Sequence, residues 1–162
     1  MRIYSLETCK EQLDRFNIRT LGVQAIDVGG TRDVVLTRKR TLNPLLGICP
    51  DLVFLDGGFN VAHLGTEVDY QVDFHDREIL SPWEKTFGMV VCFDTLEHVY
   101  DPFTWCENLI YITAPGGYVY LATVFQFPYH PSPEDYWRFS PTALRLLFKK
   151  QNFKVLWCDW EH

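Results

Sequence analysis

Residues 22–30 have the sequence GVQAIDVGG, a short apolar segment with one acid that ends in two glycines. An apolar run of this length is typical of a strand buried on both faces of a sheet, and the glycines predict a tight turn directly after it. Residues 51–58 repeat the pattern as DLVFLDGG. Two such segments in one chain indicate an α/β sheet with acids and glycines at one edge.

The rest of the chain alternates further predicted strands with predicted helices. The clearest helix starts are at Asp101 and Ser140, because each can cap free backbone N–H groups and a proline follows each of them. Helices are predicted over residues 6–16, 101–113 and from 140 onward, with a further helix over 33–42, and strands over 68–74, 89–93, 118–124 and 153–160. The β-branched residues within 33–42 disfavour the helix there.

We therefore expect an α/β fold, a Rossmann-like three-layer αβα sandwich around a mainly parallel sheet of about six strands. No repeat or linker divides the sequence. Residues 1–162 are accordingly predicted to form a single domain, with a helical cover over 1–20 and the Rossmann-like core over 21–162.

The composition narrows the class of protein. A net charge of -6 without long basic runs gives no attraction for nucleic acid or an anionic membrane surface. No apolar run approaches the roughly 20 residues of a membrane span. The five cysteines lack the spacing of a metal site, so we predict no metal and expect free thiols in a cytoplasmic protein.

The ends of the predicted strands carry the candidate ligand-binding residues. Ribose hydroxyls and an exocyclic amine are hydrogen-bond donors that suit carboxylates, and glycines let the backbone approach a ligand closely. The alternative is that acids and glycines only form turns here. The candidates are Asp27, Gly29, Gly30, Asp56, Asp73, Phe74, Phe93 and Asp94.

Two motifs in the second half carry a resemblance to a known family. The predicted strand over 89–93 is followed by Leu96-Glu97-His98-Val99, and the next helix ends at Pro115-Gly116-Gly117. With the aromatic loop over residues 129–140, these motifs resemble the class I S-adenosylmethionine-dependent methyltransferases, especially the group that acts on small molecules. The resemblance covers Ile26 to Trp160.

The resemblance implies S-adenosylmethionine as the cofactor and a role for each candidate. Asp27 and the Gly29-Gly30 turn would lie beside the methionine part, and Asp56 would bind the ribose hydroxyls. Asp73 would meet the adenine amine with Phe74 near the ring, while Phe93 and Asp94 would flank the cofactor from the other side.

The sequence departs from the family at two places. The family has three spaced glycines after its first strand, whereas this chain has two adjacent ones. The family also adds a seventh, antiparallel strand, which we do not find here. An open sheet edge would result, and a homodimer through that edge is the expected protein partner.

Methyl transfer from a sulfonium needs in-line approach of a nucleophile and, for a hydroxyl acceptor, a base. His98 and His130 are the candidate bases, since imidazole titrates near neutral pH. The alternative for His98 is a residue that only hydrogen-bonds the backbone. Candidates for binding a small-molecule substrate are Tyr129, Asp135, Tyr136 and Arg138, although Arg138 could instead pair with Glu134 or Asp135 inside the loop.

The sequence therefore predicts S-adenosylmethionine-dependent methyl transfer to a small-molecule acceptor. An alternative is a degenerate, non-catalytic methyltransferase-like module that binds a partner. A hydride-transferring dinucleotide enzyme is disfavoured, because the chain lacks Gly-x-Gly-x-x-Gly after the first predicted strand.

Overall fold

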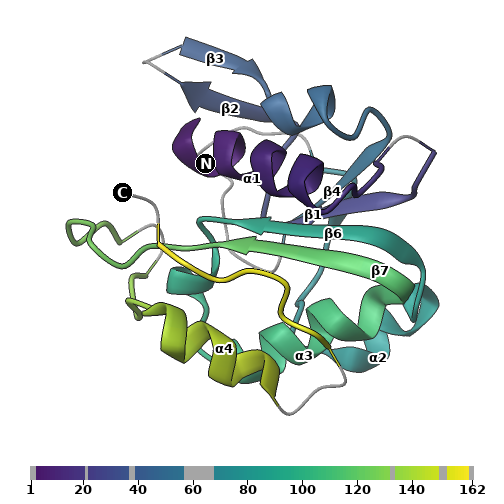
Figure 1. Ribbon diagram of the computed structural model, residues 1–162. Helices are drawn as coiled ribbons and strands as arrows, with labels where there is room; N and C mark the ends of the chain where they lie inside the picture. Colours follow the sequence, from purple (N-terminus) through teal and green to yellow (C-terminus); the bar gives the residue numbers. More distant parts are fainter. Residues whose placement is uncertain are drawn as a thin grey trace.

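The computed structural model describes residues 3–20, 22–36, 39–56, 68–131, 134–149 and 153–160. At its centre is a five-stranded sheet with the order β5-β4-β1-β6-β7, in which every neighbouring pair is parallel (Figure 1). The strands are β1 (Ala25–Val28), β4 (Leu52–Asp56), β5 (Tyr70–Gln71), β6 (Phe87–Phe93) and β7 (Thr113–Ala122).

Helices cover both faces of this sheet. Helix α1 (Ile3–Arg15) lies on one face, and α2 (Arg77–Leu80), α3 (Pro102–Ile112) and α4 (Pro141–Lys149) lie on the other (Figure 1). Among the described residues, the connections contain the 3-10 helices η1 (Pro44–Gly47), η3 (Ser81–Trp83) and η4 (Leu96–His98). The predicted Rossmann-like three-layer αβα arrangement is confirmed. Within the described residues, no helix is long and apolar enough to cross a membrane.

Each face of the sheet has its own core, because successive strand residues point to opposite faces. On the α3 side, Ile26 and Val28 pack with Trp105. On the α1 side, Ala25 packs with Leu13. The alternation directs the Asp27 side chain toward the α1 side, where its apolar neighbours offer no hydrogen bond to the carboxyl group.

The helix starts predicted from capping residues are confirmed in the structure. The Asp101 side chain accepts hydrogen bonds from the backbone N–H groups of Phe103 and Thr104, and α3 begins at Pro102. Helix α4 begins at Pro141, and Ser140 Oγ accepts a hydrogen bond from the N–H of Ala143. The helix predicted over residues 6–16 is α1.

The helix predicted over residues 33–42 is wrong. This segment forms the antiparallel hairpin of β2 (Asp33–Leu36) and β3 (Lys39–Leu42), with Asp33 opposite Leu42. The β-branched residues that disfavoured a helix suit a strand.

The sixth strand predicted over residues 153–160 is also wrong, since these residues have no assigned strand. The segment runs beside β7 (Figure 1), and both line a cavity of 860 Å³. The strand predicted over 68–74 is reduced to Tyr70–Gln71. The predicted Gly57-Gly58 turn lies outside the described residues.

Candidate functional site

The carboxyl ends of β1, β4 and β6 meet at one edge of the sheet, which we call the carboxyl edge. Val28 of β1 lies opposite Leu55 of β4. One residue further, the backbone N–H of Gly29 donates to the carbonyl of Leu55 at 2.7 Å. This bond holds the Gly29-Gly30 turn against the end of β4, beside Asp56. Ligands of open parallel sheets bind at such an edge.

Asp27 is a buried carboxyl group at this edge, with 2% of its surface exposed. Burial raises its pKa to about 7. Its Oδ2 accepts a hydrogen bond of 3.4 Å from Nδ2 of Asn43, whereas Oδ1 has no hydrogen-bond partner among the described residues. A buried oxygen of this kind is costly unless a donor reaches it, so Asp27 suits a ligand with a cationic or N–H group.

At both glycines of the Gly29-Gly30 turn, a neighbouring side chain leaves no room for a Cβ atom. Gly29 has a φ of +84°, and a Cβ there would lie 2.3 Å from Cγ2 of Thr95. A Cβ on Gly30 would lie 1.9 Å from Oδ2 of Asp27. Glycine therefore allows the turn to pack against the end of β6 on one side and against the buried carboxyl group on the other.

The acids predicted beyond β1 differ in their surroundings. Asp56 is buried at the end of β4, and its Oδ2 lies 3.5 Å from Nε2 of Gln71. Asp73 is exposed and accepts hydrogen bonds from the backbone N–H and Nδ1 of His75. The structure thus places Asp56 at the carboxyl edge and Asp73 in a surface turn.

The two predicted phenylalanines are core residues. Phe74 is fully buried, with its ring centroid 4.7 Å from that of Trp105, and its place near an adenine ring stays a prediction. Phe93 is buried and stacks on Tyr120. Asp94, which follows it, has a φ of +46°, a conformation that is uncommon outside glycine and is concentrated at functional sites.

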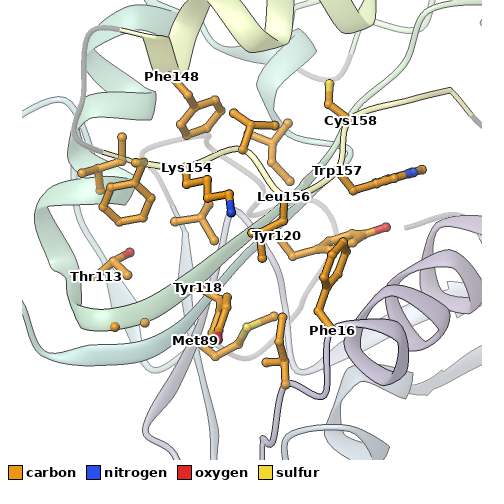
Figure 2. A pocket seen from close by; sticks show the side chains of 18 of the residues that line it. Phe16, Met89, Thr113, Tyr118, Tyr120, Phe148, Lys154, Leu156, Trp157 and Cys158 are labelled. Carbon is orange, nitrogen blue, oxygen red and sulfur yellow. The ribbon is translucent and has the colours of Figure 1, made fainter.

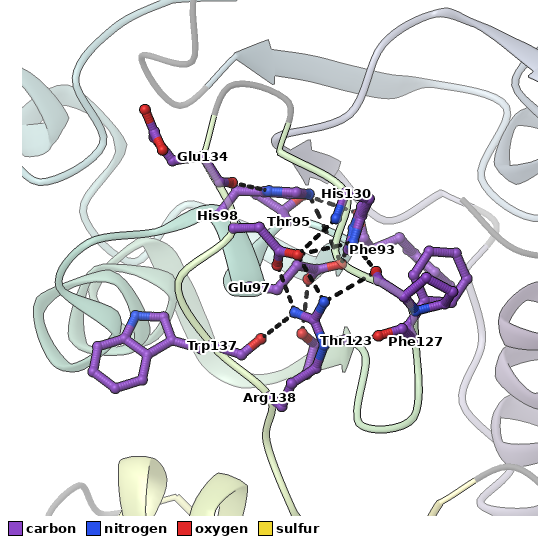
Figure 3. Close-up of polar contacts among 12 residues, drawn as sticks. Phe93, Thr95, Glu97, His98, Thr123, Phe127, His130, Glu134, Trp137 and Arg138 are labelled. Carbon is purple, nitrogen blue, oxygen red and sulfur yellow. Dashed lines mark hydrogen bonds and ion pairs between the residues drawn. The ribbon is translucent and has the colours of Figure 1, made fainter.

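A second polar group lies where the loop described over residues 125–131 and 134–139 folds onto η4 (Figure 3). Glu97 is fully buried there, and its Oε2 accepts a hydrogen bond of 2.7 Å from Oγ1 of Thr123. Its Oε1 faces Nε2 of His130 at 3.7 Å and Nε2 of His98 at 4.0 Å. The structure thus brings together both predicted bases and a carboxylate that we did not select from the sequence, although it lies inside the Leu-Glu-His-Val motif. We call these three residues the Glu97 cluster.

Arg138 organises the loop and has no N–H group left for a substrate. Its guanidinium makes two hydrogen bonds to the carboxylate of Asp135 and donates its remaining N–H groups to the carbonyls of Phe127, Pro128 and Trp137 (Figure 3). This pairing holds the pKa of Asp135 well below its usual range. The structure supports the alternative, pairing of Arg138 with Asp135 inside the loop, and the substrate contacts of these two residues stay a prediction.

The exposed aromatic residues of the loop remain candidates for substrate contact. Tyr129 is 73% exposed and directly precedes His130, and Tyr136 is 52% exposed. The backbone N–H of Tyr136 donates to the carbonyl of Glu97 at 2.8 Å, which ties the loop to η4.

The cavity of 860 Å³ is a separate feature. It lies between β7 and the segment over residues 153–159 and is lined mainly by apolar side chains, including Phe16, Tyr118, Tyr120, Phe148 and Leu156 (Figure 2). None of the predicted site residues lines it. It belongs to the outer edge of the sheet and not to the carboxyl edge.

The fold and the carboxyl edge define a Rossmann-like α/β protein with buried acids where ligands of this class bind. A family model described as a methyltransferase domain matches residues 9–157. The chain therefore belongs to this methyltransferase family, which confirms the resemblance seen in the sequence motifs. Membership of the family supports S-adenosylmethionine as the cofactor.

Individual relatives agree with the family. The chain is 26% identical over 111 residues to a ubiquinone biosynthesis O-methyltransferase of Xylella fastidiosa, a match that covers 64% of this chain and 42% of the relative. It is 23% identical over 129 residues to a protein of the same name from Xanthomonas euvesicatoria pv. vesicatoria, covering 78% of this chain and 53% of the relative. The chain thus spans about half the length of these curated relatives.

Solved structures show the same fold. A SAM-dependent methyltransferase from Archaeoglobus fulgidus superposes with a TM-score of 0.61 at 16% identity, covering 91% of this chain and 69% of that one. A chain from the complex of the Haloferax volcanii Trm112 methyltransferase activator with a methyltransferase gives a TM-score of 0.54 at 17% identity, covering 91% and 73%.

Proposed function

We propose that the chain binds S-adenosylmethionine at the carboxyl edge and transfers its methyl group to a hydroxyl group of a small-molecule acceptor. The observation that carries this proposal is the pair of buried acids, Asp27 and Asp56, at the ends of neighbouring strands beside the Gly29-Gly30 turn. The family match supports the same cofactor and reaction.

The buried acids suit the donor groups of this cofactor. The unpartnered Oδ1 of Asp27 can accept from the cationic amino group of the methionine part. Asp56 follows the end of the neighbouring strand, where a carboxylate can accept from two ribose hydroxyls. The glycine turn lets the backbone approach the ligand between them.

The Glu97 cluster is the proposed acceptor side of the site. S-adenosylmethionine carries its methyl group on a sulfonium sulfur, which keeps the electron pair of the broken bond and becomes a neutral thioether. An imidazole of His130 or His98 can take up the proton that the acceptor hydroxyl releases as its new bond to carbon forms. Tyr129 and Tyr136 offer exposed rings beside this cluster for a planar acceptor. The names of the O-methyltransferase relatives support oxygen as the acceptor atom.

Isothermal titration with S-adenosylmethionine and S-adenosylhomocysteine tests the cofactor site. We expect both ligands to bind, and Asp56→Ala to weaken binding about 10- to 100-fold, because hydrogen bonds to a charged group are lost. Asp51→Ala is the matched control: Asp51 is an exposed acid before the other end of β4, and its replacement should leave both affinities unchanged.

Two results would overturn the proposal. One is the absence of binding by either ligand at millimolar concentration, which would favour the non-catalytic partner-binding module. The other is equal affinity in the wild type and Asp56→Ala.

A further inference from the structure

Three potential metal ligands meet in the Glu97 cluster. Glu97, His98 and His130 each offer one ligand atom, and these atoms all lie within 4.8 Å of one another. Glu97 and His98 come from η4, whereas His130 comes from the loop that folds over it (Figure 3). The folded loop thus closes a three-sided arrangement that neither segment contains alone.

The hydrogen bonds around the two histidines determine which nitrogen carries a proton. Nδ1 of His98 contacts the carbonyl oxygen of Glu134. Nδ1 of His130 lies 3.0 Å from the carbonyl oxygen of Pro128 and 3.2 Å from Oδ2 of Asp135. A carbonyl or carboxylate oxygen can only accept, so Nδ1 must donate in both rings. In the neutral imidazoles, both Nε2 atoms then present a lone pair toward Glu97.

With both imidazoles neutral, three electron-pair donors therefore face one another. Glu97 is fully buried, and its Oε1 has no hydrogen-bond partner among the described residues. A buried carboxylate oxygen opposite two lone pairs is unfavourable unless a cation lies between them. The distances of 3.7 and 4.0 Å from Oε1 to the two Nε2 atoms are too long for a shared proton to form a hydrogen bond.

We propose that Glu97, His98 and His130 bind a divalent first-row transition-metal cation such as Zn²⁺. Two imidazoles and one carboxylate form the donor set that zinc and non-haem iron use when coordination positions remain open for another ligand. Mg²⁺ and Ca²⁺ prefer oxygen donors and suit this set less well. Donor atoms around a tetrahedral zinc ion lie roughly 3.3 Å apart, so the cluster needs to contract by at most about 1.5 Å.

The surroundings also match those of metal ligands in proteins. Ligating histidines almost always donate their second ring N–H to a carbonyl or a carboxylate, as both do here. The other oxygen of Glu97 is held by Thr123, and Asp135 is fixed by Arg138. These contacts orient all three donors before an ion arrives.

The cation-binding step is independent of methyl transfer, but the role we assign to the ion rests on the proposed function. An acceptor hydroxyl bound at an open position of the ion would have a lower pKa and would release its proton to solvent water. The imidazoles would then be ligands and not the base. The cluster would take only acceptors with a metal-binding oxygen.

Titration of the chelator-treated protein with ZnCl₂, and separately with MgCl₂, tests the site by calorimetry. We expect one Zn²⁺ site that Glu97→Gln and His130→Gln each weaken by at least about 100-fold, because each removes one of three ligands. Mg²⁺ should bind more weakly than Zn²⁺. The matched control is His75→Gln, since His75 is a part-buried histidine paired with Asp73 outside the cluster, and its loss should leave Zn²⁺ affinity unchanged.

A Zn²⁺ affinity that is unchanged in both Glu97→Gln and His130→Gln would overturn the proposal, as would the absence of Zn²⁺ binding. His130 lies in a loop, so His130→Gln carries the test if Glu97→Gln does not fold, which circular dichroism would show. Titration with S-adenosylhomocysteine in parallel separates the two proposals, because loss of the cation site leaves the Asp27 and Asp56 contacts intact.

Discussion

At the scale of single residues, Asp27 combines a structural cost with a proposed binding role. Its carboxyl group is buried and its pKa is raised to about 7, mainly by burial. Below about pH 4 the group is protonated in both the folded and the unfolded chain, so its burial does not lower the free energy of unfolding through ionisation. As the pH rises toward 7 the unfolded chain ionises first, so the free energy of unfolding falls, and above pH 7 the full cost of up to about 4 kcal/mol applies.

Asp27→Asn is therefore expected to raise the thermal midpoint of unfolding at pH 8 and to change it much less at pH 4.5. Thermal denaturation followed by circular dichroism at both pH values measures this. Asp51→Asn is the control, because Asp51 is exposed and no burial cost is removed there. An equal shift of the midpoint at pH 8 and pH 4.5 would contradict this explanation.

The sequence predicted the residues at the carboxyl edge better than those of the Glu97 cluster. Asp27 was identifiable as the one acid within an apolar run, and Gly29 and Asp56 because each directly follows such a run; strand ends of a parallel sheet share one edge. Glu97 belonged to a recognised motif, but its importance depends on His130, which is remote in sequence and reaches it only when the loop folds over η4. No local pattern encodes that contact.

At the scale of elements, the loop described over residues 125–131 and 134–139 depends on one arginine. Arg138 binds the carboxylate of Asp135, whose side chain is 1% exposed, and three backbone carbonyls. Arg138→Ala would leave this carboxylate buried without its cation. We expect a loss of about 3 kcal/mol in the free energy of unfolding at pH 7, measured by urea denaturation. Arg145→Ala is the control, because Arg145 is an exposed arginine that donates to the carbonyl of Cys158 and pairs with no buried carboxylate in the part of the chain that is described.

The same pair gives this loss a pH dependence with a defined sign. The pKa of Asp135 is lowered in the folded protein, first by its hydrogen bonds to Arg138. Its contribution is fully present above the unfolded pKa of about 4 and is lost as the pH falls through the lower folded pKa. The difference between wild type and Arg138→Ala should therefore shrink in strongly acidic urea titrations. A difference that stays constant with pH would show that the ion pair is not its source.

The sequence predicted the elements that depend on residues close in sequence, such as capped helices. It did not predict those that depend on pairing with a remote segment. Helices α3 and α4 begin where Asp-Pro and Ser-Pro predict, because capping is satisfied within a few residues. The segment over residues 153–160 has strand-like residues, but a strand also needs a backbone partner, and these residues have no assigned strand. Residues 33–42 form a hairpin and not the predicted helix, in agreement with the strand preference of their β-branched residues.

At the scale of the whole molecule, the sheet has one long edge strand. Strand β7 pairs with β6 on one side and is the last strand in the order of the described sheet. The apolar cavity lies along its other side, between β7 and residues 153–159 (Figure 2). A long edge beside apolar surface is a template for pairing with another strand. The single domain and the homodimer inferred from the sequence both stay predictions.

The homodimer prediction can be tested at this edge. If two copies associate through β7, sedimentation velocity at micromolar concentration should give the mass of two chains. Tyr118→Lys should return the single-chain mass, because a lysine at a sheet edge opposes strand pairing and Tyr118 lines the cavity. Phe103→Lys is the matched control, since Phe103 is an exposed aromatic residue on α3 and its loss should leave the dimer intact. A single-chain mass for the wild type, or a dimer that survives Tyr118→Lys, would exclude association through β7 under these conditions.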